Sequence, residues 1–414
     1  MSAKELYLIG ASAVISCNKH FDIIKNGGIL FNEDGILKIG NFDSLKSAKI
    51  PHKFYDSCVI LPAFINPHIH FEFSENTSTL NYGNFGVWLD SVMEHRSDLF
   101  SKVNIGDSIK EVLKSGTGCV GAISSGGLDL EALSLSPLKV VFFNEIMGAN
   151  ESKIEEIKDD FEIRFKKAKL LENARFKNAI ALHSPYSLHK ELALYALHKA
   201  RENKMLVSTH FMESKEELSW IDYQKGYFKY FFEHILGIKD AKPHYTKHEF
   251  LELFKDNATL FTHCLFLNND DFEVLQKLNA DIVSAPRSNR LLNNRYFDFF
   301  KAKDFGFKLI LSTDGKSSNN SLSLLDEARC ALFAYNKFDV NNLAKDIIYG
   351  ITANVAKRFG FNNGILERGK ASDFAIFHIK DIAKSSQIAL NFILHAKEVE
   401  DLYINGKRIN FEVL

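Results

Sequence analysis

The chain has 414 residues, 46% of them hydrophobic and 25% charged, which is the balance of a folded globular protein with room for a large and a small domain. Its 51 lysines and arginines nearly cancel its 52 aspartates and glutamates, which disfavours binding to nucleic acid or to an anionic membrane. The five cysteines form no C-x-x-C pair, so neither a disulfide framework nor a zinc ribbon is indicated. No apolar run reaches 18 residues and no signal-peptide profile opens the chain, so we expect a cytoplasmic protein.

Both ends of the chain have the composition of short strands and turns. Asp34-Gly35 separates two apolar segments near the start, and Asn405-Gly406 does the same near the end; both dipeptides are strong hairpin signals. The two terminal segments most simply pair with each other. We therefore predict one small β-sandwich domain made of residues 1–57 and 365–414.

Between these ends, eight short apolar runs alternate with amphipathic helical segments, the rhythm of a parallel βα fold. The runs are VILPAFINPHIHFEF, TGCVGAISS, LKVVFFNEIM, NAIALHSPYS, MLVSTHFMES, ATLFTHCLFL, DIVSAPRSN and KLILSTDGKSS. Each ends in polar residues, as expected for a (β/α)₈ barrel, whose active site lies at the carboxyl ends of its strands. A doubly wound sheet would need a glycine-rich phosphate loop, and no G-x-G-x-x-G sequence is present. The sequence therefore predicts a barrel over residues 58–364.

Four of the predicted strand ends carry potential metal ligands. His68 and His70 alternate on one strand, so both imidazoles can face the barrel mouth. Strands five, six and eight end in His210, His263 and Asp314. Imidazoles with one carboxylate suit zinc or a similar divalent ion, whereas each residue alone would be read as an ordinary buried histidine or a helix cap. Their joint occurrence predicts a metal site.

These motifs identify a resemblance to the amidohydrolase superfamily, in the branch of cytosine, guanine, chlorotriazine and adenosyl-homocysteine deaminases. The resemblance covers nearly the whole chain and rests on LPAFINPHIHFEF, ALHSPYS, STHFMES, THCLFL, APRSNRLL and STDGKSSNNSLSLLDE. It implies a TIM-like barrel enzyme, a hydrolase acting on the C–N bond of a cyclic amidine. It also implies one divalent metal ion per chain, with zinc expected and iron or manganese as alternatives.

The resemblance also implies a role for individual residues. It implies that the metal ligands are His68, His70, His210 and Asp314. Glu213 matches the catalytic acid that protonates the substrate ring, His263 matches the residue that holds the attacking water, and Asp314 can take the proton of that water. A carboxylate stabilised at a helix N-terminus would also explain Glu213, and both readings are compatible. Strand four has no lysine to bridge two metals, which favours a single ion.

The motifs are most similar to those of bacterial deaminases that act on 6-aminodeoxyfutalosine in menaquinone biosynthesis. This resemblance implies an adenine nucleoside whose 5′ chain bears a benzoate, and a tail carboxylate of this kind calls for an arginine. Arg96, Arg287 and Arg290 are open candidates. The expected substrate-binding residues are His183, Trp88, Glu94, Glu213, Arg96, Arg287, Ser288 and Asn289.

Several alternatives stay open at this point. Methylthioadenosine, adenosyl-homocysteine or adenosine could be the substrate, followed by guanine or cytosine. A non-catalytic assembly protein on the same fold would be expected to lose metal ligands, and none is missing. The cytidine-deaminase signature is absent. We expect a small-molecule nucleoside as the partner and leave a homodimer open. The long segment between Glu213 and His263 is predicted either to cover the barrel mouth or to form a subunit contact.

Overall fold

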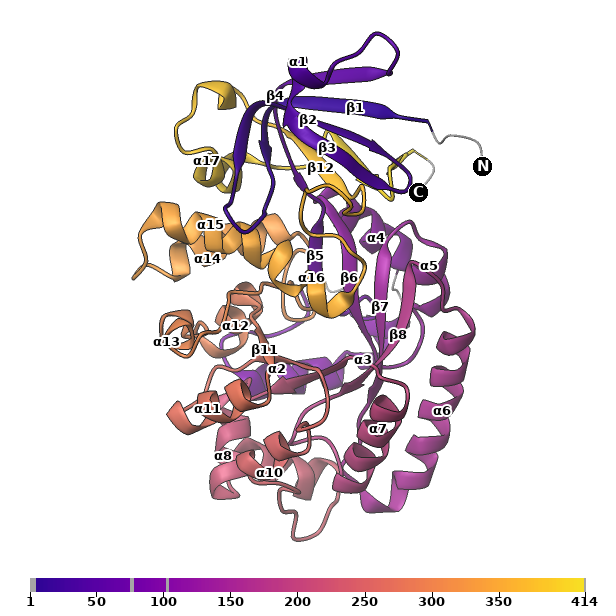
Figure 1. Ribbon diagram of the computed structural model, residues 1–414. Coiled ribbons are helices and arrows are strands. Elements are labelled where there is room, and N and C mark those ends of the chain that lie inside the picture. Colours follow the sequence, from indigo (N-terminus) through magenta and orange to yellow (C-terminus); the bar gives the residue numbers. More distant parts are fainter. Residues whose placement is uncertain (1–4, 75–77, 102–103, 413–414) are drawn as a thin grey trace.

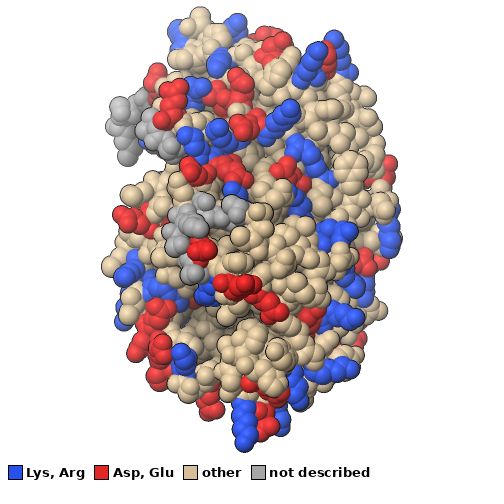
Figure 2. Space-filling model, turned by 180° about the vertical axis from the view of Figure 1, so that it is seen from behind, with Lys and Arg blue, Asp and Glu red and all other residues tan. Residues whose placement is uncertain are grey.

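The computed structural model describes residues 5–74, 78–101 and 104–412. It consists of a barrel with an outer layer of helices and a separate sheet that lies across one end, where the two termini also meet (Figure 1). Within the described ranges, no helix combines the length and apolar character needed to cross a membrane. Lysines, arginines and acidic residues are interspersed on the face seen in Figure 2, in keeping with the balanced composition.

The terminal sheet joins the two ends of the chain, as the sequence predicted. Among the described residues it has the strand order β14-β13-β12-β4-β1-β2-β3. Its strands are β1 (Tyr7–Ile15), β2 (Ile23–Asn32), β3 (Gly35–Asn41), β4 (His52–Pro62), β12 (Phe374–His378), β13 (Asp401–Ile404) and β14 (Lys407–Arg408). The contact between the ends is direct, because β12 pairs antiparallel with β4. The boundary predicted after residue 57 falls inside β4.

Both predicted hairpins are present. β13 and β14 are joined by Asn405 and Gly406, whose φ angles of 51° and 73° give the two left-handed positions that a tight hairpin turn requires. β2 and β3 pair from Asn32 opposite Gly35. Here Gly35 closes the turn at φ 149°, where an added Cβ would lie 2.6 Å from the Lys370 carbonyl oxygen.

The barrel contains a parallel sheet with the order β11-β10-β9-β8-β7-β6-β5 in the described residues. Its strands are β5 (Phe64–Ile69), β6 (Thr117–Ser124), β7 (Lys139–Ile146), β8 (Phe176–Leu182), β9 (Val207–Phe211), β10 (Thr259–His263) and β11 (Asp281–Val283). These strands correspond to the first seven predicted runs. The fold class predicted from the sequence is therefore confirmed.

The eighth run closes the barrel without forming a regular strand. It is joined to β11 by a single bridge between Ser284 and Leu311, and to β5 by the Asp314 N–H, which donates to the His68 carbonyl oxygen at 3.1 Å. The Asn66 side chain completes the junction by donating to Thr313 Oγ1 at 2.7 Å. A side chain thus replaces part of the backbone ladder next to Asp314.

Most helices of the described residues surround the barrel, whereas the first, a single turn, packs on the terminal sheet (Figure 1). The helices are α1 (Phe42–Leu45), α2 (Phe85–Glu94), α3 (Arg96–Ser101), α4 (Ile105–Lys114), α5 (Leu130–Leu135), α6 (Ile154–Leu170), α7 (Lys190–Glu202), α8 (Lys215–Tyr223), α9 (Tyr227–Tyr230), α10 (Lys247–Glu252), α11 (Asn269–Lys277), α12 (Pro286–Asn293), α13 (Phe299–Asp304), α14 (Leu324–Ala334), α15 (Val340–Gly350), α16 (Ala353–Phe359) and α17 (Ile388–His395). A π-helical turn, Phe231–Ile235, follows α9.

Alternate strand residues fill the barrel interior below its mouth. Ile65, Val141 and Phe143 belong to one buried apolar cluster, which Val355 and Phe359 of α16 complete. Because side chains alternate along a strand, the residue two positions after Phe143 on β7 faces the same interior, whereas on β5 the pairing with β6 shifts register between Asn66 and Ile69. The polar strand ends described below therefore stand on a packed apolar floor.

Candidate active site and metal centre

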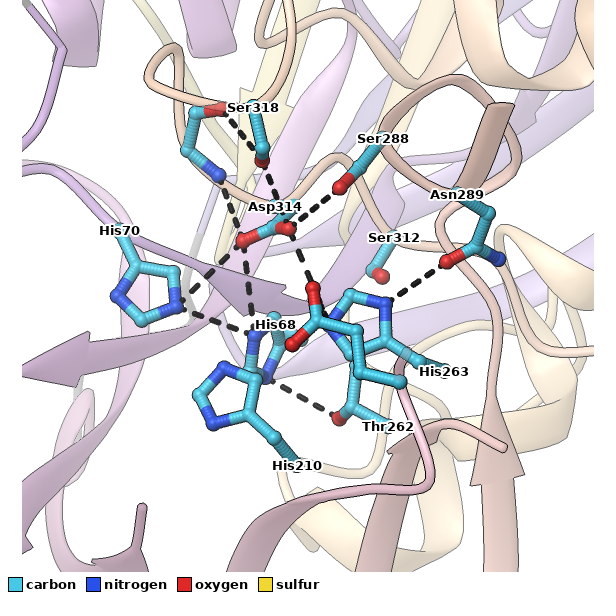
Figure 3. A network of polar contacts seen from close by, with 12 residues as sticks. His68, His70, His210, Thr262, His263, Ser288, Asn289, Ser312, Asp314 and Ser318 are labelled. Carbon is cyan, nitrogen blue, oxygen red and sulfur yellow. Dashed lines mark hydrogen bonds and ion pairs between the residues drawn. The ribbon is translucent and has the colours of Figure 1, made fainter. Parts of the chain in front are cut away.

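Three histidines and one aspartate, predicted from three separate strand ends, converge at the barrel mouth (Figure 3). His68 Nε2 lies 3.2 Å from His70 Nε2. Asp314 Oδ1 lies 3.5 Å from His70 Nε2 and 3.8 Å from His68 Nε2. The ring of His210 packs 4.7 Å from that of His68 and 5.5 Å from that of His70, measured between centroids. Two ligand atoms bound to one tetrahedral zinc at about 2.0–2.1 Å lie about 3.3 Å apart, so the His68–His70 spacing fits such an ion.

The ring nitrogens that face away from this centre are engaged by neighbouring groups. His210 Nδ1 donates to the His183 carbonyl oxygen at 2.8 Å, and His68 Nδ1 lies 3.2 Å from Thr262 Oγ1. These contacts leave the Nε2 atoms directed at the centre, the arrangement typical of metal-ligating histidines. Burial is the main cause that lowers the pKa of His68 and of His210 well below the ordinary value, so both imidazoles are neutral and can act as ligands.

Asp314 is held in place by several donors. Ser288 Oγ and Ser318 Oγ each donate to its Oδ2 at 2.8 Å, and the Gly315 N–H donates to Oδ1 at 2.9 Å. Burial acts to raise the pKa of Asp314, but the surrounding imidazoles and the Ser288 hydroxyl outweigh it and lower that pKa below its ordinary value. The carboxylate is therefore ionised. Its backbone is left-handed at φ 61°, a strained conformation of the kind that clusters at functional sites.

Glu213 and His263 lie on the other side of Asp314. His263 Nε2 is 3.5 Å from Glu213 Oε1 and 3.9 Å from Asp314 Oδ2, while its Nδ1 donates to Asn289 Oδ1 at 2.8 Å. His263 is completely buried, and its Nε2 finds no hydrogen-bond partner within the described ranges. A buried polar atom without a partner indicates a missing water, ion or substrate atom, and this position is the one expected for the attacking water.

Glu213 has the environment of a proton donor. It follows β9, is 6% exposed, and its backbone N–H donates to Glu217 Oε2 at 2.8 Å. Burial, followed by the charge of Asp314, raises the pKa of Glu213 well above its ordinary value. A carboxyl group whose pKa is raised in this way keeps its proton to a higher pH than usual and can act as a general acid.

A cavity of about 340 Å³ opens above these residues, within the size range of small-molecule sites. Much of its wall is apolar and consists of Phe85, Trp88, Val92, Phe231, Phe232 and Leu236. The last three belong to the π-helical turn and the residue after it, within the segment that separates Glu213 from His263. That segment therefore forms a wall of the cavity, the first of the two alternatives given for it. Of these wall residues the sequence predicted Trp88 but not the other five.

The predicted substrate-binding residues divide into two groups. His183, Trp88, Arg96 and Glu213 line the cavity. Trp88 is fixed by its indole N–H, which donates to the Ser317 carbonyl oxygen at 2.8 Å, and burial lowers the pKa of His183 to about 4, so its ring is neutral.

The remaining predicted residues are not among those that line the cavity. Ser288 and Asn289 instead support Asp314 and His263 through the hydrogen bonds given above. The Arg287 guanidinium lies 3.6 Å from Asp326 Oδ2, and Glu94 is exposed on α2. Arg290, the third arginine considered for the tail, donates to Asn294 Oδ1.

One cavity residue received no role from the sequence. Glu145 is the last residue but one of β7 and is 2% exposed, and one of its carboxylate oxygens lies within 4.8 Å of ring nitrogens of His183 and His210. Burial raises its pKa above the ordinary value. The sequence signal that could have identified Glu145 is the alternation of side chains along a strand, because Val141, Phe143 and Glu145 occupy the same face of β7.

Comparison with known proteins gives concordant results. Residues 59–409 match the amidohydrolase family. The chain is 40% identical to a Helicobacter pylori adenosine deaminase over 410 residues, covering 97% of this chain and 99% of the relative. It is 38% identical to the aminodeoxyfutalosine deaminase of a Nitratiruptor species over 356 residues, covering 85% of this chain and 87% of the relative. The crystal structure of Helicobacter pylori aminofutalosine deaminase in complex with methylthio-coformycin superposes with a TM-score of 0.92 at 38% identity, covering 98% of this chain and all of that one.

Proposed function

The chain belongs to the amidohydrolase family, and on that premise we propose that it is a metal-dependent hydrolytic deaminase of adenine nucleosides. The observation that carries the proposal is the placement of the buried Glu213, whose pKa is raised, beside a four-donor His/Asp cluster at the floor of one cavity. The reaction breaks the C6–N bond of the purine and forms a C6–O bond, so that water enters and ammonia leaves.

We propose that one divalent ion is held by His68, His70, His210 and Asp314, and that zinc suits this donor set best. When bound, such an ion lowers the pKa of water and allows a water molecule to act as a nucleophile near neutral pH. Elemental analysis of the purified protein tests the proposal. One equivalent of zinc, iron or manganese per chain supports it and identifies the metal, whereas two equivalents would contradict the single site.

The protein groups around the cluster then move the protons. His263 holds the attacking water through Nε2, and the ionised Asp314 accepts a proton from it. Glu213 donates a proton to ring nitrogen N1, which makes C6 more electrophilic. The ionised Glu213 then takes the proton of the C6 hydroxyl and delivers it to the departing amine, which leaves as ammonia, and the proton held by Asp314 restores Glu213. General acid–base help of this kind is typically worth about 10²–10⁴-fold in rate.

Within this class, we propose 6-aminodeoxyfutalosine as the substrate, giving futalosine and ammonia in menaquinone biosynthesis. The apolar wall around Phe231 and Phe232 suits an aromatic 5′ tail. Among the three arginines considered, Arg96 lines the cavity, which supports it as the partner of the tail carboxylate, whereas Arg287 lies beside Asp326 and Arg290 bonds to Asn294.

The test is ammonia release from 6-aminodeoxyfutalosine, methylthioadenosine, adenosyl-homocysteine and adenosine. We expect the highest kcat/KM for 6-aminodeoxyfutalosine, and we expect Arg96→Gln to raise its KM while sparing adenosine; Arg290→Gln is the matched control. If adenosine proves the best substrate, the tail assignment fails while the deaminase chemistry stands. Absence of ammonia release from every purine and pyrimidine tested would refute the proposed reaction.

A further inference from the structure

Glu145 presents a buried carboxylate oxygen that no described residue satisfies. Its Oε2 accepts a hydrogen bond from Ser125 Oγ at 2.5 Å, whereas Oε1 has no partner in the described part of the chain. The residue is 2% exposed and lines the same cavity as Glu213 and Trp88. Leaving a carboxylate oxygen buried and unpaired is costly, so an arrangement of this kind indicates a hydrogen-bond partner, and because this oxygen belongs to a cavity residue a group of the substrate can supply it.

The position of this carboxylate is fixed from behind. Ser125 belongs to the loop after β6, and Glu72 holds that loop by accepting the N–H groups of Ser125, Gly126 and Leu128 at 2.7, 2.9 and 2.8 Å. Glu72 is fully buried. Ser125 therefore has little freedom to move away, and its hydroxyl fixes one oxygen of Glu145 while the other stays available. Glu72 and Ser125 thus hold the Glu145 carboxylate in one position before any ligand binds.

Glu145 lies beside the proposed metal centre but on a different strand, with one carboxylate oxygen within 4.8 Å of ring nitrogens of His183 and His210. β9, β8 and β7 are neighbours in the barrel, and their ends carry His210, His183 and Glu145 in that order. His210 is a proposed metal ligand, so Glu145 lies two strands further around the rim. The strand alternation described above directs its side chain to the barrel interior.

The chemistry of an adenine nucleoside limits what can meet this oxygen. Besides the amine that is hydrolysed, its hydrogen-bond donors are the sugar hydroxyls, because N1, N3 and N7 are acceptors. A hydroxyl also suits either protonation state of a carboxyl group, since it can both donate and accept. On the basis of the deaminase function proposed above, we propose that Glu145 binds the 2′ or 3′ hydroxyl of the nucleoside sugar and thereby selects ribonucleosides.

The experiment compares kcat/KM for adenosine, 2′-deoxyadenosine and 3′-deoxyadenosine in the metal-loaded wild type and in Glu145→Gln and Glu145→Ala. In the wild type we expect one deoxy analogue to be poorer than adenosine by about tenfold to a hundredfold, the usual worth of a hydrogen bond to a charged group. In the variants, the ratio of kcat/KM for adenosine to kcat/KM for that deoxy analogue should fall towards one, mainly because adenosine becomes a worse substrate. Ser125→Ala should reduce the same ratio partially, since Ser125 acts through Glu145.

The controls separate this inference from the function on which it rests. Glu156 lies in a neighbouring cavity with Glu145 but does not line the substrate cavity, so Glu156→Gln should keep the wild-type ratios. If the wild type deaminates adenosine without discriminating against either deoxy analogue, or if the Glu145 variants keep the discrimination, the inference is overturned while the deaminase stands. Loss of one metal equivalent in Glu145→Gln would also overturn it, because Glu145 would then be a ligand. Absence of deamination of all nucleosides overturns both.

Discussion

Replacing Glu213 by Gln isolates the proton transfer from the rest of the site. The backbone N–H of Glu213 is held by Glu217, so the residue stays in place whatever its side chain carries. Glutamine keeps the size of the side chain and one hydrogen-bond donor towards N1, but it has no proton to give. The expected loss is therefore the whole general-acid contribution, a fall in kcat of about 10²–10⁴-fold. This corresponds to about 2.7–5.5 kcal/mol of activation free energy.

The assay is steady-state ammonia release together with the metal content of each variant. KM and metal content should change little, because the amide still binds N1 and Glu213 is not among the four proposed ligands. Glu216→Gln, the same substitution on a partly exposed neighbour, serves as control and should retain wild-type kcat. Because the pKa of Glu213 is raised, wild-type kcat/KM should fall as pH rises through that pKa. The pH profile of the variant should lack this fall. A kcat within about threefold of wild type would refute the general-acid role.

Three further outcomes follow from individual contacts. His210→Ala removes one of four proposed ligands, so metal content and activity should both fall sharply; unchanged metal in elemental analysis would contradict the assignment. Asp373→Asn should lower the free energy of unfolding by about 3–5 kcal/mol, because Lys139 Nζ, 2.5 Å from Asp373 and buried with it, would lose its counter-charge; a denaturant midpoint shift near zero would argue against this. Burial raises the pKa of Glu217 to about 8, so the folded chain keeps a proton that the unfolded chain releases near pH 4.5. Stability should therefore fall as pH rises from about 4.5 to 8, and Glu217→Gln should flatten that dependence of Tm; equal slopes in both proteins would refute it.

Local sequence signals were enough to predict the fold class. Alternating apolar runs and helical segments predicted the barrel strands, and Asn405-Gly406 predicted the final hairpin, because both depend on short-range periodicity and turn geometry. The irregular backbone at the place of the eighth barrel strand could not be predicted from such local signals. KLILSTDGKSS has the composition of a strand, but the Asn66 side chain takes the place of backbone pairing near Thr313, and this contact spans 247 positions of sequence.

The site was predictable where residue identity itself is diagnostic. Histidines alternating at one strand end and recurring at others indicate a metal centre before any packing is known, and in the structure His68 shares one cluster of donors with His70 and Asp314 and another with His210. The apolar wall was not predictable, because Phe231 and Phe232 come from an inserted segment whose position depends on tertiary packing. Their aromatic character alone is equally typical of a core.

The spacing of residues along a helix or strand decides which of the predicted side chains can face the cavity. Trp88 and Glu94 are six residues apart on α2, so their side chains point about 120° apart around the helix axis. Trp88 lines the cavity and Glu94 is exposed, as this spacing requires, and the substrate contact of Glu94 stays a prediction. Glu145 satisfies the corresponding condition for a strand, since it follows Val141 and Phe143 at intervals of two. If an acid binds the sugar from the cavity wall, periodicity favours Glu145, and the deoxynucleoside ratios in variants of Glu145 are the measurement that tests this.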